Sequence, residues 1–353
     1  MLDACSDVSP GRCAMWSRLV VLVSLLLLGG LAPAVGAPDS NAGIQSALET
    51  LKRANAAVVG LEVTAVPQAP SAETLGRERS GSGVVIGADG LILTIGYLIV
   101  EAETIQVTTQ DRKVWPAQPV AYDQATGFGL VRPLLPLRGI TPVRLGSVSH
   151  LAVGEPLMVS TGGSDAEVEV TRLVSKRPFS GYWEYHIDDA LFTSPAVGNH
   201  SGAPVFNQRG ELLGIGSLFV ADALGQPPRV PGNMFVPIDL LKPILAEMQA
   251  TGSSRQSHRP WLGLTSGEQD GRVFVMRVTQ GSPAQAGGMQ RGDMILAVDG
   301  EPVDSLERFY KGLWKRARPD DEIRITLQRG DDVRTLTLRG VDRMTTMAKP
   351  AGI

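Results

Sequence analysis

The sequence predicts a mainly β protein with two domains. A chain of 353 residues is long enough for about two domains of ordinary size. Its 40 glycines and 24 prolines favour many short strands joined by turns over long helices. Short apolar or alternating runs, each typical of a strand, recur at Val58–Val66, Gly83–Ile86, Leu91–Thr94, Thr104–Thr108, Val114–Val120, Gly129–Val131, Pro156–Ser160, Val168–Val174, Pro204–Asn207 and Leu212–Phe219. This spacing of short strands favours a barrel or a sandwich.

The composition excludes several classes of protein. A chain that is 43% hydrophobic and 20% charged is neither collagen, nor coiled coil, nor bulk disorder. A net charge of -3 gives no general support for nucleic-acid binding. The cysteines and histidines are few, namely Cys5, Cys13, His150, His186, His200 and His258. They leave little from which to build a zinc cluster, so we expect no metal and no cofactor.

The first 36 residues have the pattern of a secretory signal peptide. Arg12 and Arg18 precede the uncharged run Leu19–Leu28, and small residues follow that run. Ala34 and Gly36 are placed for cleavage after Gly36. This pattern predicts that the rest of the chain is exported, and a bacterial periplasm is the compartment that fits best.

Two alternatives stay open at this end of the chain. Residues 19–37 are 19 uncharged residues, near the lower length limit for a membrane span. The leader is therefore either cleaved or kept as an inner-membrane anchor. Translation begins either at Met1 or at Met15.

The remaining pattern divides the chain into parts. Helices are expected at Asn41–Asn55 and Asp239–Thr251, where apolar residues recur at helical spacing. A polar stretch between the two globular parts is expected to be a linker. The predicted parts are, in order, the leader (1–36), the strand-rich domain (43–251), the linker (252–259), a second and smaller domain (260–342) and a tail (343–353).

Short motifs follow one another in an order typical of one family. The first domain contains Ser80–Thr94, Asp123–Val131, Arg144–Gly154 and Gly198–Ile215, and the second contains Trp261–Leu264, Gly281–Ala284 and Gly292–Ile295. In this order the first set resembles the trypsin-like protease domain of the HtrA/Deg family of exported serine proteases. The second set resembles the PDZ domain of that family. The resemblance runs from about Gly43 to Asp342 and implies a two-barrel trypsin-like (chymotrypsin-fold) domain followed by a PDZ domain.

The resemblance places the catalytic triad on residues that depart from the family's pattern. The family's histidine follows Leu-Thr-x-x, and here Leu93-Thr94-Ile-Gly is followed by Tyr97. The family's aspartate follows a threonine, and here Gly127 stands in its place. Ser201 keeps the nucleophile position. A phenol has a pKa of about 10 and cannot act as a base near pH 7, and a glycine offers no carboxylate to orient a base. The triad is therefore predicted to be degenerate.

Other groups bear on any residual activity of Ser201. The resemblance assigns the oxyanion hole to backbone N–H groups at Asn199 and Ser201, and asparagine tolerates the positive φ that this turn needs. No sequence pattern marks a substitute base among His150, His186, His200, His258 and Lys176.

The stretch from Asp189 to Ser201 is longer than the family leads us to expect. It contains Leu191 and Phe192. We expect these apolar residues either to fill the substrate pocket or to form a different apolar surface.

The second domain keeps the pattern of a peptide-binding site. By resemblance, the loop at Trp261, Leu262, Gly263 and Leu264 presents backbone N–H groups to a peptide's C-terminal carboxylate, and Leu264 begins the strand edge to which the peptide adds. The helix predicted at Ser305–Arg316 forms the other wall. Its residues Phe309 and Leu313 are expected at the groove, and its other apolar residues in the core.

Two functions remain open from the sequence. The first is an exported, proteolytically inactive HtrA/Deg-like protein of envelope quality control, which binds unfolded or C-terminal segments of polypeptides as a regulator or chaperone. The alternative is an active periplasmic serine endopeptidase that degrades misfolded proteins. The resemblance also implies a homo-trimer or a mixed oligomer with a family protease, and no nucleic-acid partner is expected.

Overall fold

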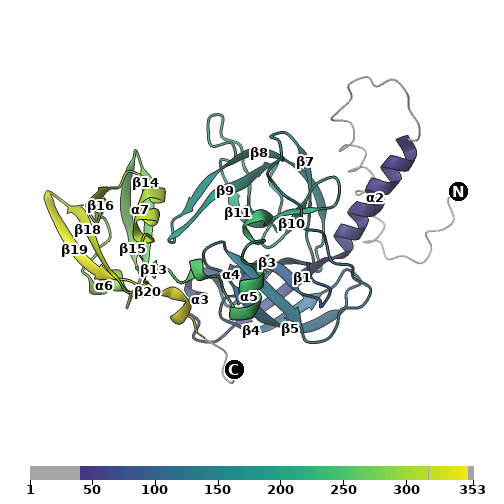
Figure 1. Cartoon of the computed structure of the whole chain (residues 1–353), viewed down its shortest axis with the longest axis horizontal. Coiled ribbons are helices and arrows are strands. Elements are labelled where there is room, and N and C mark those ends of the chain that lie inside the picture. The colour runs from purple at the N-terminus through teal and green to yellow at the C-terminus, as the bar shows by residue number, and fades with distance from the viewer. Residues whose placement is uncertain (1–39, 317, 349–353) are drawn as a thin grey trace.

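The computed structural model describes residues 40–316 and 318–348. The predicted signal peptide or membrane anchor and the end of the predicted tail lie outside the described residues. Within the described residues, no helix is both long enough and apolar enough to cross a membrane. Figure 1 shows the helix α2 (Ser40–Ala56) on one side of the strand-rich domain and the second domain on the opposite side.

The first domain consists of two closed barrels. One has the strand order β1-β2-β3-β6-β5-β4 and the other the order β10-β11-β12-β9-β8-β7. The strands of the first barrel are β1 (Val58–Ala65), β2 (Glu78–Val85), β3 (Ile92–Ile95), β4 (Ala102–Thr108), β5 (Val114–Tyr122) and β6 (Phe128–Pro133). Those of the second are β7 (Pro156–Ser160), β8 (Val168–Gly181), β9 (Tyr185–Ser194), β10 (Pro204–Phe206), β11 (Leu212–Val220) and β12 (Gly232–Pro237).

Glycines allow the two barrels to approach closely. A Cβ atom on Gly60 would collide with the backbone of Gly163, and one on Gly162 would collide with the backbone of Val59. A hydrogen bond from the Ser82 N–H to the Ser201 carbonyl, at 2.8 Å, joins the barrels at the same junction. The sequence thus brings Ser201 against the first barrel.

The second domain is a β-sheet with two short helices. The main sheet has the order β14-β15-β16-β18-β19, and β17 pairs with β16. Along β18, Ile323, Ile325 and Leu327 are buried and alternate with more exposed polar residues, as expected for a half-buried strand. The elements are β13 (Pro260–Trp261), β14 (Leu264–Gln269), β15 (Arg272–Val278), α6 (Pro283–Ala286), β16 (Met294–Val298), β17 (Glu301–Pro302), α7 (Leu306–Leu313), β18 (Glu322–Arg329), β19 (Asp332–Arg339) and β20 (Val341–Asp342).

The predicted architecture is confirmed: a mainly β domain of two closed barrels precedes a smaller β domain, the predicted PDZ domain. The predicted helix Asp239–Thr251 is wrong in extent. A 3-10 turn at Ile238–Leu240 is followed by the helix α5 (Leu245–Thr251). Pro243 explains the break, because proline lacks the N–H of a helical hydrogen bond and disfavours helical geometry in the residue before it.

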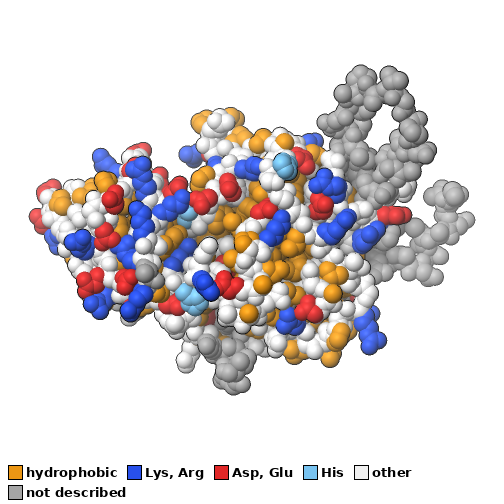
Figure 2. Space-filling model, viewed as in Figure 1, with side chains coloured by type: hydrophobic (Ala, Val, Ile, Leu, Met, Phe, Trp, Pro, Cys, Tyr) orange, Lys and Arg blue, Asp and Glu red, His pale blue; other side chains and the backbone are white. Residues whose placement is uncertain are grey.

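The surface of the PDZ domain carries charges of both signs. On the face shown in Figure 2, Lys and Arg side chains lie among Asp and Glu side chains over this domain, while hydrophobic side chains gather over the barrels. Charges of both signs are therefore interspersed on this face of the domain.

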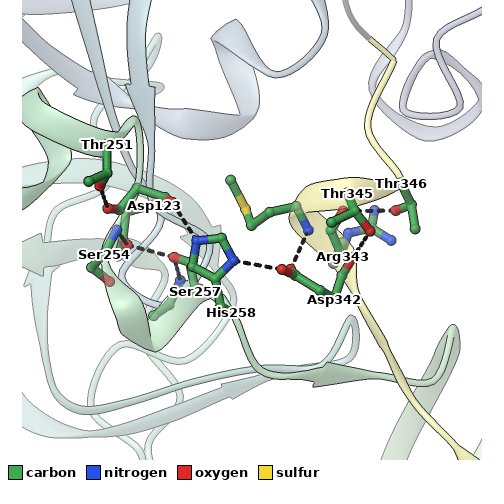
Figure 3. A network of polar contacts seen from close by, with 12 residues as sticks. Asp123, Thr251, Ser254, Ser257, His258, Asp342, Arg343, Thr345 and Thr346 are labelled. Atoms are coloured by element: carbon green, nitrogen blue, oxygen red, sulfur yellow. Dashed lines mark hydrogen bonds and ion pairs between the residues drawn. The ribbon is translucent and has the colours of Figure 1, made fainter. Parts of the chain in front are cut away.

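The segment between the two domains is packed rather than solvated. Asp123, directly after β5, accepts hydrogen bonds from the Ser254 N–H at 3.0 Å and the Ser257 hydroxyl at 2.6 Å. On the far side of the segment, His258 contacts the Asp342 carboxylate at 2.6 Å (Figure 3). The stretch 252–259, expected to be a simple polar linker, therefore holds the PDZ domain against the first barrel.

Hydrogen bonding keeps the buried Asp123 carboxyl ionised. Burial raises its pKa, but the hydrogen bonds from Ser254, Ser257 and Thr126 outweigh burial and hold the pKa below its usual value. A carboxylate whose native pKa is lowered stabilises the fold above its unfolded pKa.

We predict that Asp123→Asn lowers the free energy of unfolding by about 2 kcal/mol at pH 7, because an amide has one acceptor oxygen and donors remain buried without a partner. The unfolded pKa is near 3.8, so the loss is fully present above about pH 4 and shrinks as the pH falls through the lower native pKa. Urea unfolding of both proteins between pH 3 and pH 7 measures this difference. Asp331→Asn, at an exposed turn, is the control. An equal loss for both variants at pH 7 contradicts the anchoring role of Asp123.

Candidate active site and peptide-binding groove

The structure brings Tyr97 and Ser201 together at the junction of the barrels. Tyr97 lies in the short helix α4 (Gly96–Ile99), directly after β3, and Ser201 lies in the turn before β10. The Tyr97 hydroxyl is 2.7 Å from the Ser201 hydroxyl and 2.8 Å from the Ser217 carbonyl oxygen. The phenol therefore meets the serine at hydrogen-bond distance, where a catalytic base would have to act.

Proton counting decides the direction of these two hydrogen bonds. The Ser217 carbonyl can only accept, and a phenol has one proton to donate. If both hydrogen bonds exist together, Tyr97 donates to the Ser217 carbonyl and accepts from the Ser201 hydroxyl. The Ser201 proton is then directed at a neutral phenol oxygen.

The Tyr97 phenol is a poor proton acceptor. Burial raises its pKa to about 12, and the hydrogen bond from Ser201 only partly opposes that rise. The group is therefore protonated throughout the neutral range. At this distance the neutral phenol can share a hydrogen bond with the Ser201 hydroxyl.

Gly127 contacts Gly96, the residue before Tyr97, and as a glycine it supplies no acid. It precedes β6, its φ is +84°, and its carbonyl accepts from the Gly96 N–H at 2.6 Å. A Cβ atom at this position would lie 3.3 Å from the hydroxyl of Tyr185. The aromatic ring of Tyr185 thus stands beside the place from which an aspartate side chain would extend.

The turn before Ser201 has the geometry expected of Asn199. Its φ is +47°, in the left-handed region that asparagine tolerates. A polar pocket of about 150 Å³ opens here, lined in part by Asn199, Ser201, Ser82 and Gly162. The two predicted oxyanion-hole residues thus share one cavity.

Three of the five candidate substitute bases, His186, Lys176 and His258, have contacts away from Ser201. His186 contacts Ser180 at 2.9 Å and Asp188 at 3.2 Å, within the hairpin that joins β8 to β9. Lys176 donates to the Val148 carbonyl at 3.2 Å. His150 is exposed, His258 contacts Ser253 and Asp342, and His200 precedes Ser201 in the turn. Burial lowers the pKa of His200, so its imidazole is neutral at pH 7.

The expectation for Leu191 and Phe192 was wrong. Both lie in β9, and both side chains are fully buried in the hydrophobic core. As neighbours on a strand they point to opposite faces of β9, and each packs in a different hydrophobic cluster, because both faces of the strand are covered here. They form neither an exposed apolar surface nor a loop.

The predicted carboxylate-binding loop holds a carboxylate from the chain itself. The backbone N–H groups of Leu262, Gly263 and Leu264 donate to Glu184 at 3.0, 2.8 and 2.7 Å. Gly263 has φ +83°. Trp261 is one residue outside this set: its backbone pairs with Val341 in β20.

Glu184 is a residue of this loop site that the sequence analysis missed. Its side chain is 1% exposed, and burial raises its carboxyl pKa while the three N–H donors and the charge of Arg343 oppose that rise.

On the helix α7, the two residues expected at the groove, Phe309 and Leu313, are fully buried. Tyr310 is the residue of α7 whose hydroxyl donates to the β8–β9 hairpin, at the Gly181 carbonyl.

Comparisons with known proteins agree with this architecture. Residues 81–215 match the trypsin-like peptidase domain, and residues 260–339 match the PDZ domain. The serine protease PepD of Mycobacterium tuberculosis is 28% identical, over 90% of this chain and 75% of that relative. A protein of Ectopseudomonas mendocina, named as a DegP-like periplasmic serine endoprotease, is 28% identical over 67% of this chain. This chain is a homologue of the HtrA/DegP-like serine proteases.

Solved structures of HtrA-type proteases have the same fold as this chain. The HtrA-type protease AlgW, solved with a tripeptide, has a TM-score of 0.52 at 20% identity and covers 83% of this chain and 96% of its own. A serine endoprotease from Yersinia pestis has a TM-score of 0.51 at 21% identity and covers 86% and 98%. The HtrA homologue spans 52% of the length of the Ectopseudomonas relative.

We predict that Gly127→Asp destabilises the HtrA homologue by about 3 kcal/mol. A left-handed φ costs a non-glycine residue about 1 kcal/mol or more, and crowding by Tyr185 and burial of the new charge add the remainder. The matched control is Gly139→Asp, because Gly139 has φ +78° and open space around a Cβ atom. Thermal and urea unfolding measure both variants. Equal losses would show that Tyr185 does not close the space.

Proposed function

We propose that this HtrA homologue is an exported binding protein of envelope protein quality control, built on a protease fold that does not hydrolyse peptide bonds. The observation that carries the proposal is the hydrogen bonding of Tyr97 to both Ser201 and Ser217 where a histidine base is usual. The export pattern before residue 37 and the naming of the Ectopseudomonas relative as periplasmic support the envelope location.

The chemistry of acyl transfer supports the absence of proteolysis. A serine nucleophile needs a base to take its proton and a third group to orient that base. Here the base position holds a phenol with a pKa of about 12, and the acid position holds Gly127. Losing the base costs about 10⁶-fold in rate in a well-studied serine protease, or roughly 8 kcal/mol of barrier. Such a rate is too slow for protein turnover.

The PDZ loop supports polypeptide C-termini as the partner. Its three N–H groups converge on a carboxylate, which is the group that a C-terminus offers. We propose unfolded or C-terminal segments of envelope proteins as ligands, bound as a regulator or chaperone would bind them. Assembly as a homo-trimer, or with a family protease, belongs to the same proposal.

An active periplasmic endopeptidase is the alternative. It is favoured by the retained Ser201 beside a polar pocket and by the names of the relatives. The two functions differ in whether Ser201 reacts.

We predict that the purified protein cleaves denatured casein no faster than its Ser201→Ala variant, and that a fluorophosphonate probe labels neither. Tyr97→His alone should restore little, because no carboxylate orients the new imidazole. Tyr97→His with Gly127→Asp should stay far below a family protease, because Tyr185 crowds the aspartate. Ser201-dependent cleavage by the unmodified protein would establish the endopeptidase.

We predict that the PDZ domain binds hydrophobic peptides with a free C-terminus at micromolar affinity or weaker, because the contact is one strand edge and one pocket. Amidation of the peptide should weaken binding, since it removes the charge that the loop accepts. Fluorescence anisotropy with paired free and amidated peptides measures this. Equal affinity for both forms would rule out a carboxylate-binding role for the loop.

A further inference from the structure

The tip of the β8–β9 hairpin occupies the groove between β14 and α7. Glu184 places its two carboxylate oxygens on the N–H groups of the loop Leu262–Leu264, as a bound C-terminus would. A second contact belongs to the strand edge: the Ser266 N–H donates to the Tyr182 carbonyl at 2.9 Å. The hairpin therefore makes both contacts that define peptide binding by strand addition, one to the loop and one to the edge.

The direction of the hairpin also matches that of a bound peptide. Residue 184 meets the loop, and residue 182 meets β14 two positions beyond Leu264, so the two segments run antiparallel. The Glu184 side chain stands in for a terminal carboxylate. The tip thus imitates the last residues of a peptide ligand.

Contacts on the opposite wall hold the hairpin in the groove. The hydroxyl of Tyr310, on α7, donates to the Gly181 carbonyl at 2.8 Å, and the Tyr310 side chain is fully buried. At the rim, Lys311 pairs with Asp188 of β9 at 2.6 Å and with Glu307 at 2.8 Å. Both walls of the groove and its end are therefore engaged by one hairpin.

Glu184 is an unfavourable residue for its own turn. The residues Gly181 and Tyr185 pair across the hairpin, which leaves a three-residue loop, and Glu184 at its end has φ +57°. Three-residue hairpin loops normally place glycine at this left-handed position. Glu184 is therefore strained in its own turn, while its carboxylate accepts hydrogen bonds from the PDZ loop. This combination indicates a role for Glu184 beyond closing the turn.

We propose that Glu184 is a resident ligand of the PDZ groove, and that an external partner is a polypeptide whose free C-terminus must displace the hairpin tip. This inference rests on the proposed function, in which the groove takes C-terminal peptides. While the hairpin occupies the groove, a peptide cannot bind. The apparent affinity for a peptide is therefore its intrinsic affinity multiplied by the fraction of time for which the groove is open. Binding of a partner and release of the hairpin from the PDZ domain are then one event.

The test uses the full exported chain and four variants. Glu184→Gln removes one acceptor oxygen and places an NH₂ group against the loop donors, and Glu184→Asp keeps the charge but shortens the reach. Tyr310→Phe weakens docking without touching the loop. Glu301→Gln, an exposed change of the same type in the PDZ domain, is the matched control. The probes are fluorescein-labelled decapeptides that end in Val, Ile, Leu or Phe.

We expect both Glu184 variants to bind these peptides about tenfold or more tighter than the unmodified chain, with Tyr310→Phe in between and Glu301→Gln unchanged. Without peptide, hydrogen exchange at the amides of Leu262, Gly263 and Leu264 should speed up in Glu184→Gln and stay slow in the control. Peptide affinities that do not change across all variants would overturn the resident ligand and leave the proposed function standing. Faster exchange in Glu184→Gln with no peptide bound by any variant would support the resident contact and overturn the proposed function. Equal exchange in both proteins would overturn the resident contact.

Discussion

A phenol has one proton to give, and that constraint governs the junction of the two barrels. Once the Tyr97 proton is committed to the Ser217 carbonyl, the Ser201 hydroxyl can only donate toward Tyr97. The contact satisfies three polar groups at a partly buried place, where an unmade hydrogen bond would be costly. Under the proposed function, the same contact leaves the serine without a base, because a neutral phenol is a poor proton acceptor at pH 7.

Two buried carboxylates attach the PDZ domain to the barrels by accepting several hydrogen bonds each. Asp123 of the first barrel gathers donors from the segment 252–259, and Glu184 of the second barrel gathers three N–H groups from the PDZ loop. Each is almost fully buried, and each is tolerated because several donors surround it. The PDZ domain is therefore held at its connection and at its groove. A ligand that competes for the groove would act on one of these two attachments.

Sequence alone predicts the domain order and much of the first barrel, because short apolar runs and turn glycines mark strands such as β1 and β7 directly. The order of the surrounding motifs also assigns Tyr97, Gly127 and Ser201 to the triad positions; that assignment stays a prediction, and the structure shows the contact between Tyr97 and Ser201. The prediction of one helix over Asp239–Thr251 overlooked Pro243, although a proline in a sequence is itself a signal for a helix break. Glu184 was not, because its role depends on a loop almost eighty residues further along the chain. The same holds for Tyr185, whose ring crowds Gly127 only after the barrels pack.

The most direct test of the account is the ionisation of the Tyr97 phenol. Tyrosine labelled with ¹³C at Cζ gives one resonance per tyrosine, and the Tyr97→Phe variant assigns the relevant one. The account predicts that this resonance shows a neutral phenol from pH 6 to pH 10, in keeping with a pKa of about 12. Ionisation of Tyr97 below about pH 8.5, far under the ordinary tyrosine pKa, would contradict it, since the group could then accept the Ser201 proton.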